Sequence, residues 1–213
     1  MDIKQEIFNL LDGKVHFYNS DYNPTSDSVY LANFAPSKKT VLDVGVGTGG
    51  VSLCYLEKSP NSIITGIDNS LDRLEICKKN ASLNNRNIEL IHENFLSWKT
   101  DRCFDLVITN PPYFSGTASK HNAHHNIDLS KWTQYCIKRV KPRGLFCCIL
   151  DPFFLNKVLF SIPNSFGELK IFPIFSKKNT AERVLISARL GISGGSSVYR
   201  GMNTEISNTK TKK

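Results

Sequence analysis

The segment Asn110-Pro111-Pro112-Tyr113 follows an apolar run at 105–109. An adenine amine is a poor nucleophile because its lone pair is delocalised into the ring, so a site that alkylates it must localise that pair. The side-chain oxygen of Asn110 and the main-chain carbonyl of Pro111 can accept the amine hydrogens. The prolines stiffen the loop, and the Tyr113 ring can stack on an extruded base. These residues predict methyl transfer to a planar nitrogen, with all four in the catalytic segment.

A glycine-rich turn lies upstream and predicts a nucleotide-like cofactor site. Asp43 is followed by Gly45, Gly47 and Gly49, and Asp68 closes the next apolar run. Glycines permit a tight turn from strand to helix with close backbone approach to a ligand. An acid at the position of Asp68 can accept a hydrogen bond from a ribose hydroxyl. The same spacing satisfies the GxGxxG pattern of dinucleotide enzymes, so this half of the chain fits either class.

The segment at Asn110 decides between these classes, because nicotinamide chemistry needs no such element after the fourth strand. The expected electrophile is the sulfonium methyl of S-adenosylmethionine, and no metal is required. Asn110 then serves both the cofactor and the substrate. After the third strand, Asn94 can accept from the cofactor's adenine amine and Phe95 can pack on its ring. A surface turn is an equally good interpretation of Asn94.

The elements that position these residues follow from the alternation of apolar runs with helical patterns beyond residue 40. The predicted fold is α/β and Rossmann-like, a mainly parallel seven-stranded sheet with a C-terminal antiparallel hairpin. Helices are expected over 70–83, behind a Ser70 N-cap, and over 128–140. Strands are expected at 40–44, 63–67, 88–91, 104–109, 145–150, 168–175 and 183–190.

The length of 213 residues suits one sizeable core. We expect a single domain over 1–190, with 1–39 as an N-terminal segment that closes over substrate and cofactor. The remainder, 191–213, is rich in Gly, Ser, Asn, Thr and Lys and is expected to form a polar, flexible tail.

The net charge is +8 and the pI near 9.2, which favours an acidic partner such as a phosphate backbone. No apolar run approaches the roughly 20 residues that span a membrane, and no apolar leader is visible, so a cytoplasmic protein is expected. The six cysteines lack metal-ligand spacing and are expected to be reduced core residues.

The residues resemble the class I S-adenosylmethionine methyltransferases, and within them the bacterial valine-tRNA adenine-N6 methyltransferase family. That resemblance implies N6-methylation of an adenine beside the anticodon, with tRNA as the substrate. The matching segments extend over most of the chain, at 11–15, 26–32, 43–50, 110–113, 123–124, 132, 141–144 and 181–185.

The resemblance also implies a substrate side made of Tyr113, Phe114, Asp27 and His124. Asp27 would cap or close the cofactor pocket, although a helix N-cap is an equal interpretation. His124 can contact RNA phosphate when protonated. Asn94 departs from the family, which has an acid there, and an Asn oxygen can still accept one hydrogen bond.

Other functions stay open on sequence grounds. Release-factor glutamine methylation uses the same chemistry, but only about forty residues precede the first predicted strand, too few for the helical substrate domain of such enzymes. Guanine-N2 methylation of ribosomal RNA remains possible, and a DNA adenine methyltransferase is disfavoured because no region suits a target-recognition domain. A non-catalytic RNA-binding protein with the same fold and a dehydrogenase are the alternatives from other classes.

Overall fold

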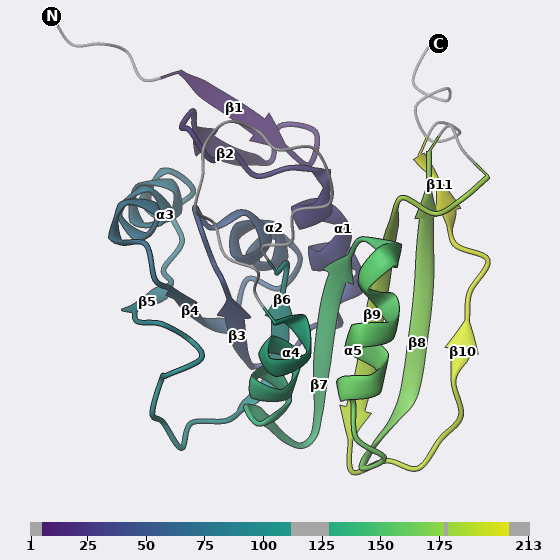
Figure 1. The fold of residues 1–213 in the computed structure, drawn as a ribbon. Coiled ribbons are helices and arrows are strands. Elements are labelled where there is room, and N and C mark those ends of the chain that lie inside the picture. Colours follow the sequence, from purple (N-terminus) through teal and green to yellow (C-terminus); the bar gives the residue numbers. More distant parts are fainter. Residues whose placement is uncertain (1–5, 112–127, 177–178, 205–213) are drawn as a thin grey trace, which may run out of the picture.

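A single large sheet runs through the molecule (Figure 1). In a computed structural model of the protein, the described residues are 6–111, 128–176 and 179–204. Within these residues the sheet has nine strands in the order β10-β8-β9-β7-β6-β3-β4-β5, with β11 beside β8. The strands are β3 (Thr40–Val44), β4 (Ile63–Asp68), β5 (Glu89–His92), β6 (Phe104–Thr109), β7 (Val140–Leu150), β8 (Phe166–Phe175), β9 (Arg183–Leu190), β10 (Ser197–Val198) and β11 (Met202–Asn203).

The pairing brings the predicted site elements to one edge. β3 is parallel to both of its neighbours, β4 and β6, and the pairs β4–β5 and β6–β7 are also parallel. The segments that leave the carboxyl ends of β3, β4 and β6 therefore emerge side by side. β9 runs antiparallel between β7 and β8. The predicted α/β, Rossmann-like class is confirmed, and its seven strands are the longer strands of the observed sheet.

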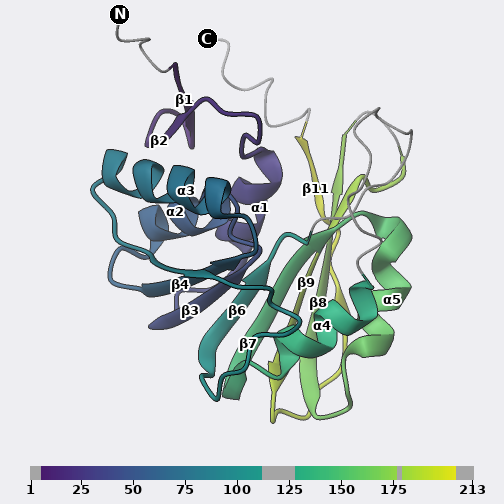
Figure 2. The same ribbon diagram turned by 60° about the vertical axis from the view of Figure 1, so that its left-hand side comes forward.

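Helices cover both faces of the sheet. Figure 2 shows α1, α2 and α3 on one side and α4 and α5 on the other. The two faces carry separate apolar clusters, one around Leu106 and Tyr55 and the other around Val107 and Phe146. Successive strand residues thus face opposite clusters, as expected for strands buried on both faces. The helices are α1 (Ser26–Phe34), α2 (Gly50–Lys58), α3 (Leu71–Leu83), α4 (Leu129–Ile137) and α5 (Leu155–Ser161), with a short 3-10 turn η1 (Pro152–Phe154) before α5.

The helix predicted over 70–83 is confirmed as α3, with the Ser70 hydroxyl accepting from the main-chain N of the third residue beyond it. The helix predicted over 128–140 is too long. Asp128 caps its start, but α4 ends at Ile137 and β7 begins at Val140. The pairing of β7 with β6 shifts register here, and Arg143 has φ +62°. This irregularity lets the strand extend through Pro142, which stands within its bounds.

A hairpin that the sequence did not predict lies near the N-terminus, formed by β1 (Ile7–Leu10) and β2 (Val15–Tyr18). Two side-chain amides, one in α3 and one on the residue that caps its C-terminus, hold β2 in place. The main-chain N of His16 donates to Asn84 Oδ1 at 2.8 Å, and that of Tyr18 donates to Asn80 Oδ1 at 2.9 Å. Phe17, between them, is fully buried. These four-residue strands are too short to show a clear alternation, so tertiary contacts fix them.

The C-terminal segment differs from the expected flexible tail over residues 191–204. β10 and β11 both pair in parallel with β8 and extend the sheet at its outer edge. Residues 205–213 lie outside the described part.

Five of the six cysteines are buried, as expected for core residues, and Cys103 is half-buried. In the described parts of the chain, no helix is long and apolar enough to cross a membrane.

Candidate active site

The glycine-rich turn joins β3 to α2 at the carboxyl edge of the sheet. Gly45, Gly47 and Gly49 have φ values of +75°, +55° and +92°, in the region that side chains with a Cβ rarely adopt. A Cβ on Gly49 would also lie 2.9 Å from Cys77 Sγ. The turn therefore depends on glycine, and it leaves the backbone open at the cavity described below.

Asp68, the last residue of β4, anchors this turn. Its Oδ2 accepts from the main-chain N of Gly47 at 2.9 Å, and its Oδ1 accepts from that of Ser70 at 3.0 Å. The side chain is largely buried, with 7% of the residue exposed. A carboxylate offers about four acceptor positions, so Asp68 can still accept from a ligand hydroxyl.

Asp43 lies behind the turn rather than in the cavity. It is 1% exposed, and its Oδ2 accepts from the Ser52 hydroxyl at 2.6 Å. Burial raises the pKa of Asp43 to about 7; the hydrogen bond from Ser52 opposes this shift, and the nearby Asp68 charge adds to it. Asp43 and Gly49, both predicted cofactor residues, are absent from the described residues that line the cavity. Their contribution is to the shape of the turn.

Asn110 leaves the end of β6 from a firmly held position. The hydroxyl of Thr109 donates to the carbonyl of Val44 in β3 at 2.8 Å, and Trp132 Nε1 donates to the same hydroxyl oxygen at 3.1 Å. Both hydrogen bonds are buried. Asn110 itself is half-buried and Pro111 is buried. The direction in which the chain carries Asn110 is thus set by contacts to β3 and α4.

The turn, Asp68 and Asn110 meet at a cavity of about 80 Å³. Six residues that the sequence assigns to the site line it: Gly45, Gly47, Asp68, Asn94, Phe95 and Asn110. Sites that enclose a whole drug-sized ligand have volumes of roughly 300–1,000 Å³. The described residues therefore enclose only part of such a ligand. The complete lining is Tyr22, Gly45, Gly47, Ile67, Asp68, Asn69, Arg73, Glu93, Asn94, Phe95, Asn110 and Trp132.

The loop after β5 supplies one wall. Phe95 is 5% exposed, and its ring centroid lies 5.4 Å from that of Trp132, so it is also part of the core. Asn94 is exposed, and its Oδ1 accepts from the main-chain N of Leu96 at 3.0 Å. One lone pair of that oxygen therefore stabilises the loop, and the other remains available for a ligand.

Tyr22 and Arg73 are among the cavity residues that the sequence-based prediction did not assign to the site. The Arg73 guanidinium lies 4.2 Å from the centroid of the Tyr22 ring, a cation–π contact. The Tyr22 carbonyl also accepts from the Thr48 hydroxyl at 3.2 Å, beside the glycine turn. Tyr22 belongs to a polar stretch without periodicity, whose loop is shaped by the bond from Ser20 N to Asn23 Oδ1. No sequence signal placed it here.

Asp27, which the sequence assigned to the substrate side, does not line this cavity. It is in the first turn of α1, and its Oδ2 lies 2.8 Å from Arg183 Nε at the start of β9. The ion pair joins two of the segments on which the family resemblance rests, and it does not line the cavity. Four further residues assigned from sequence fall outside the described residues: Pro112, Tyr113, Phe114 and His124.

The sequence model of the methyltransferase small domain matches residues 23–133, just over half of the chain. The chain belongs to the methyltransferase small domain family. This match includes every residue that lines the cavity except Tyr22. The family assignment and the site geometry thus concern the same part of the molecule.

Two relatives show how far the similarity of this family member extends. A tRNA1(Val) (adenine(37)-N6)-methyltransferase from Flavobacteriaceae bacterium strain 3519-10 is 31% identical over 136 residues, covering 60% of this chain and 58% of the relative. A release factor glutamine methyltransferase from Buchnera aphidicola is 31% identical over 151 residues, covering 70% of this chain and 44% of the relative. The chain spans about half the length of the curated relatives it matches.

The fold of this methyltransferase small domain protein also recurs among solved structures. A protein from Agrobacterium tumefaciens, described as a predicted O-methyltransferase, superposes with a TM-score of 0.68. The alignment covers 84% of this chain and 88% of that protein at 20% sequence identity. The likeness establishes the class I methyltransferase fold.

Proposed function

We propose that this protein is an S-adenosylmethionine-dependent N-methyltransferase that modifies N6 of an adenine in the anticodon region of tRNA. The observation that carries the proposal is the position of Asn110, which lines one cavity together with Asp68 and the glycine turn. An acceptor for a substrate amine is thereby adjacent to the predicted cofactor residues. The small-domain family and the name of the Flavobacteriaceae relative support the same activity.

The lining residues fit an adenosyl group chemically. Asp68 retains acceptor positions for ribose hydroxyls, Ile67 and Phe95 supply apolar surface for a base, and the turn at Gly45 and Gly47 allows close approach of the backbone. When bound, S-adenosylmethionine supplies an electrophilic methyl group on a sulfonium sulfur. The protein's task is then to hold and align the two reactants.

On the substrate side, the side-chain oxygen of Asn110 and the carbonyl of Pro111 would accept hydrogen bonds from the target amine. These bonds localise the nitrogen lone pair and stabilise the positive charge that develops on it. The hydrogen bonds from Thr109 and Trp132 hold the strand end that carries both acceptors. We also propose that Tyr113 and Phe114 stack on the target base. Both residues lie outside the described part of the chain.

A tRNA partner suits the net charge of +8, because a basic protein attracts a phosphate backbone. His124 is proposed to contact phosphate when protonated. Asp27 is proposed to act indirectly, by fixing α1 to β9 through Arg183. A tRNA-modifying role would place the protein in the cytoplasm.

Glutamine methylation of a release factor is the second candidate. The Buchnera relative with that name aligns to 70% of this chain, more than the 60% aligned to the tRNA enzyme. A glutamine amide nitrogen is delocalised in the same way as an adenine amine, so the same acceptors would serve. The described residues thus fit either substrate.

The deciding experiment is a methyl-transfer assay with labelled S-adenosylmethionine, offering unmodified bulk tRNA and release factor in separate reactions. Asn110→Ala is the test variant, and Asn156→Ala, an exposed position on α5, is the matched control. Label recovered as N6-methyladenosine with wild type and Asn156→Ala, and lost with Asn110→Ala, supports the proposal. Label only in protein supports the glutamine activity. Label in neither substrate would contradict both.

A further inference from the structure

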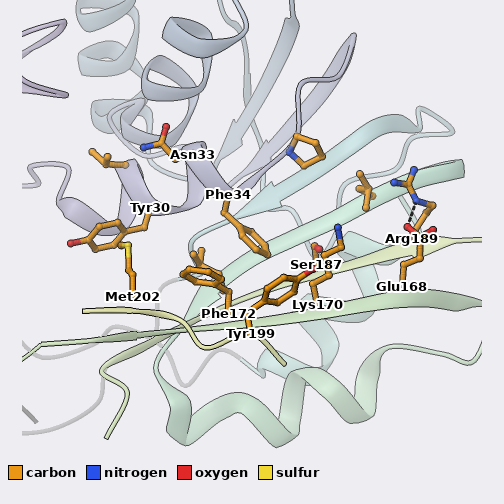
Figure 3. Close-up of a pocket in the computed structure, with 14 residues that line it drawn as sticks. Tyr30, Asn33, Phe34, Glu168, Lys170, Phe172, Ser187, Arg189, Tyr199 and Met202 are labelled. Carbon is orange, nitrogen blue, oxygen red and sulfur yellow. Dashed lines mark hydrogen bonds and ion pairs between the residues drawn. The ribbon is translucent and has the colours of Figure 1, made fainter. Parts of the chain in front are cut away.

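A second cavity, of about 720 Å³, lies between α1 and the face of β8 and β9 (Figure 3). Alternate residues of these strands point into it: Glu168, Lys170 and Phe172 from β8, and Leu185, Ser187 and Arg189 from β9. The C-terminal segment contributes Tyr199 and Met202. This volume is within the usual range of small-molecule sites, roughly 300–1,000 Å³. None of its lining residues lines the methyltransferase cavity.

Aromatic rings form the apolar part of this cavity. The Phe172 ring lies 6.2 Å from that of Phe34 in α1 and 6.1 Å from that of Tyr199. Figure 3 shows these three rings together, with Tyr30 and Met202 farther along the same cavity. Aromatic rings provide large, rigid contact surfaces for an apolar body.

Polar side chains line the cavity next to these rings. Ser187 is 5% exposed, and within the described part of the chain its hydroxyl makes no hydrogen bond. A buried hydroxyl without a partner is unfavourable, so a ligand atom that bonds to it would be stabilised. Lys170 is paired with Ser187 across the two strands and is exposed. Figure 3 shows the two side chains next to each other beside the Tyr199 ring.

The charges favour an anion. Arg189 Nε and Glu168 Oε2 lie 2.8 Å apart and balance each other. Among the described residues, no carboxylate lies within ion-pair distance of the Lys170 ammonium. The cavity therefore carries one uncompensated positive charge, at Lys170 beside the unpaired Ser187 hydroxyl, and most of its remaining lining is apolar.

We propose that this cavity binds a small amphipathic molecule with an apolar body and a single anionic head group. The head lies at Lys170 and Ser187, and the body lies between Phe34, Phe172 and Tyr199. Because the two cavities share no lining residue, this site binds independently of the cofactor.

Two fluorescent probes test the proposal on the purified full chain. The first, 8-anilinonaphthalene-1-sulfonate, has an aromatic body and one negative charge. The second, N-phenyl-1-naphthylamine, has the same rings without the sulfonate. Lys170→Met keeps an unbranched side chain, one atom shorter, and removes its charge. Lys157→Met, on α5 at the opposite face of the sheet, is the matched control.

We expect the sulfonate probe to bind one site saturably, and its affinity to fall about fivefold to tenfold in Lys170→Met, as for the loss of one charge-assisted contact. Lys157→Met should bind it like wild type, and the neutral probe should bind Lys170→Met and wild type equally. Phe172→Ala should weaken both probes. Competition with decanoate then reports which apolar body the site accepts. Displacement of the sulfonate probe by decanoate indicates an aliphatic body, and displacement by aromatic acids alone indicates an aromatic one.

Three results would overturn the proposal. These are sulfonate binding that never saturates, equal affinity in Lys170→Met and Lys157→Met, and displacement of the probe by S-adenosylhomocysteine. Circular dichroism of each variant establishes that a lost signal does not reflect unfolding. A probe bound with equal affinity by all charge variants would assign the cavity to an apolar partner instead.

Discussion

Replacing Asp43 with Asn should stabilise the protein at alkaline pH, and the gain should itself depend on pH. In the folded state burial raises the pKa of Asp43 to about 7, against an ordinary value of 3.8. Between these two pH values the folded protein keeps a proton that the unfolded chain has lost. The folded state therefore loses stability relative to the unfolded state as pH rises from about 4 to about 7, and the loss is constant above that range.

The magnitude follows from the two pKa values. Each pH unit of difference corresponds to about 1.4 kcal/mol, so the ionisation of Asp43 costs about 4 kcal/mol of unfolding free energy at pH 8. Of this, about 2.5 kcal/mol develops between pH 5 and pH 8. Asn has the same shape and can still accept the hydrogen bond from the Ser52 hydroxyl, but it does not ionise.

The measurement is urea-induced unfolding of wild type and Asp43→Asn, without cofactor, at pH 5, 6, 7 and 8. All other titrating groups are common to both proteins, so the difference between their unfolding free energies isolates Asp43. That difference should grow by about 2.5 kcal/mol in favour of Asn from pH 5 to pH 8. Asp101→Asn, in an exposed loop, controls for the change in net charge. If the profiles of wild type and Asp43→Asn run parallel over this range, the reasoning is refuted.

Three further predictions concern hydrogen bonds and an ion pair described above. Asp68→Asn should weaken S-adenosylmethionine binding roughly 10- to 100-fold in calorimetry, since hydrogen bonds to a charged group contribute about 1.5–3 kcal/mol; an unchanged Kd would exclude Asp68 as a ligand. Trp132→Phe should lower the free energy of unfolding by about 1–3 kcal/mol, because the buried Thr109 oxygen loses a donor, and an unchanged denaturation midpoint would contradict that account. A double-mutant cycle with Asp27→Asn and Arg183→Ala should give a coupling of about 1 kcal/mol that decreases with salt, whereas zero coupling at low salt would show that this half-buried pair does not fix α1 to β9.

Local patterns determined most of the fold. The seven longer strands and α3 were predictable because each carries its own signal, an apolar run of strand length or a capped helical repeat after Ser70. The parallel order then brings the ends of β3, β4 and β6 together, so that Gly47, Asp68 and Asn110 meet at one cavity. These residues were predictable as a set because their chemistry depends on strand ends, which the sequence marks clearly.

Other features were decided by contacts between segments far apart in the chain. Tyr22 is held beside the glycine turn by the Thr48 hydroxyl and by Arg73 of α3, and Asp27 pairs with Arg183, 156 residues away in β9. Asp43 has the type and spacing of a ligand residue, yet the packing of α2 places Ser52 against it and buries its carboxylate behind the turn. The sequence by itself thus determined the elements and the chemical types at their ends. Only the tertiary structure decided which of those groups face a cavity and which are enclosed by the core, because burial is a property of the neighbours that packing supplies.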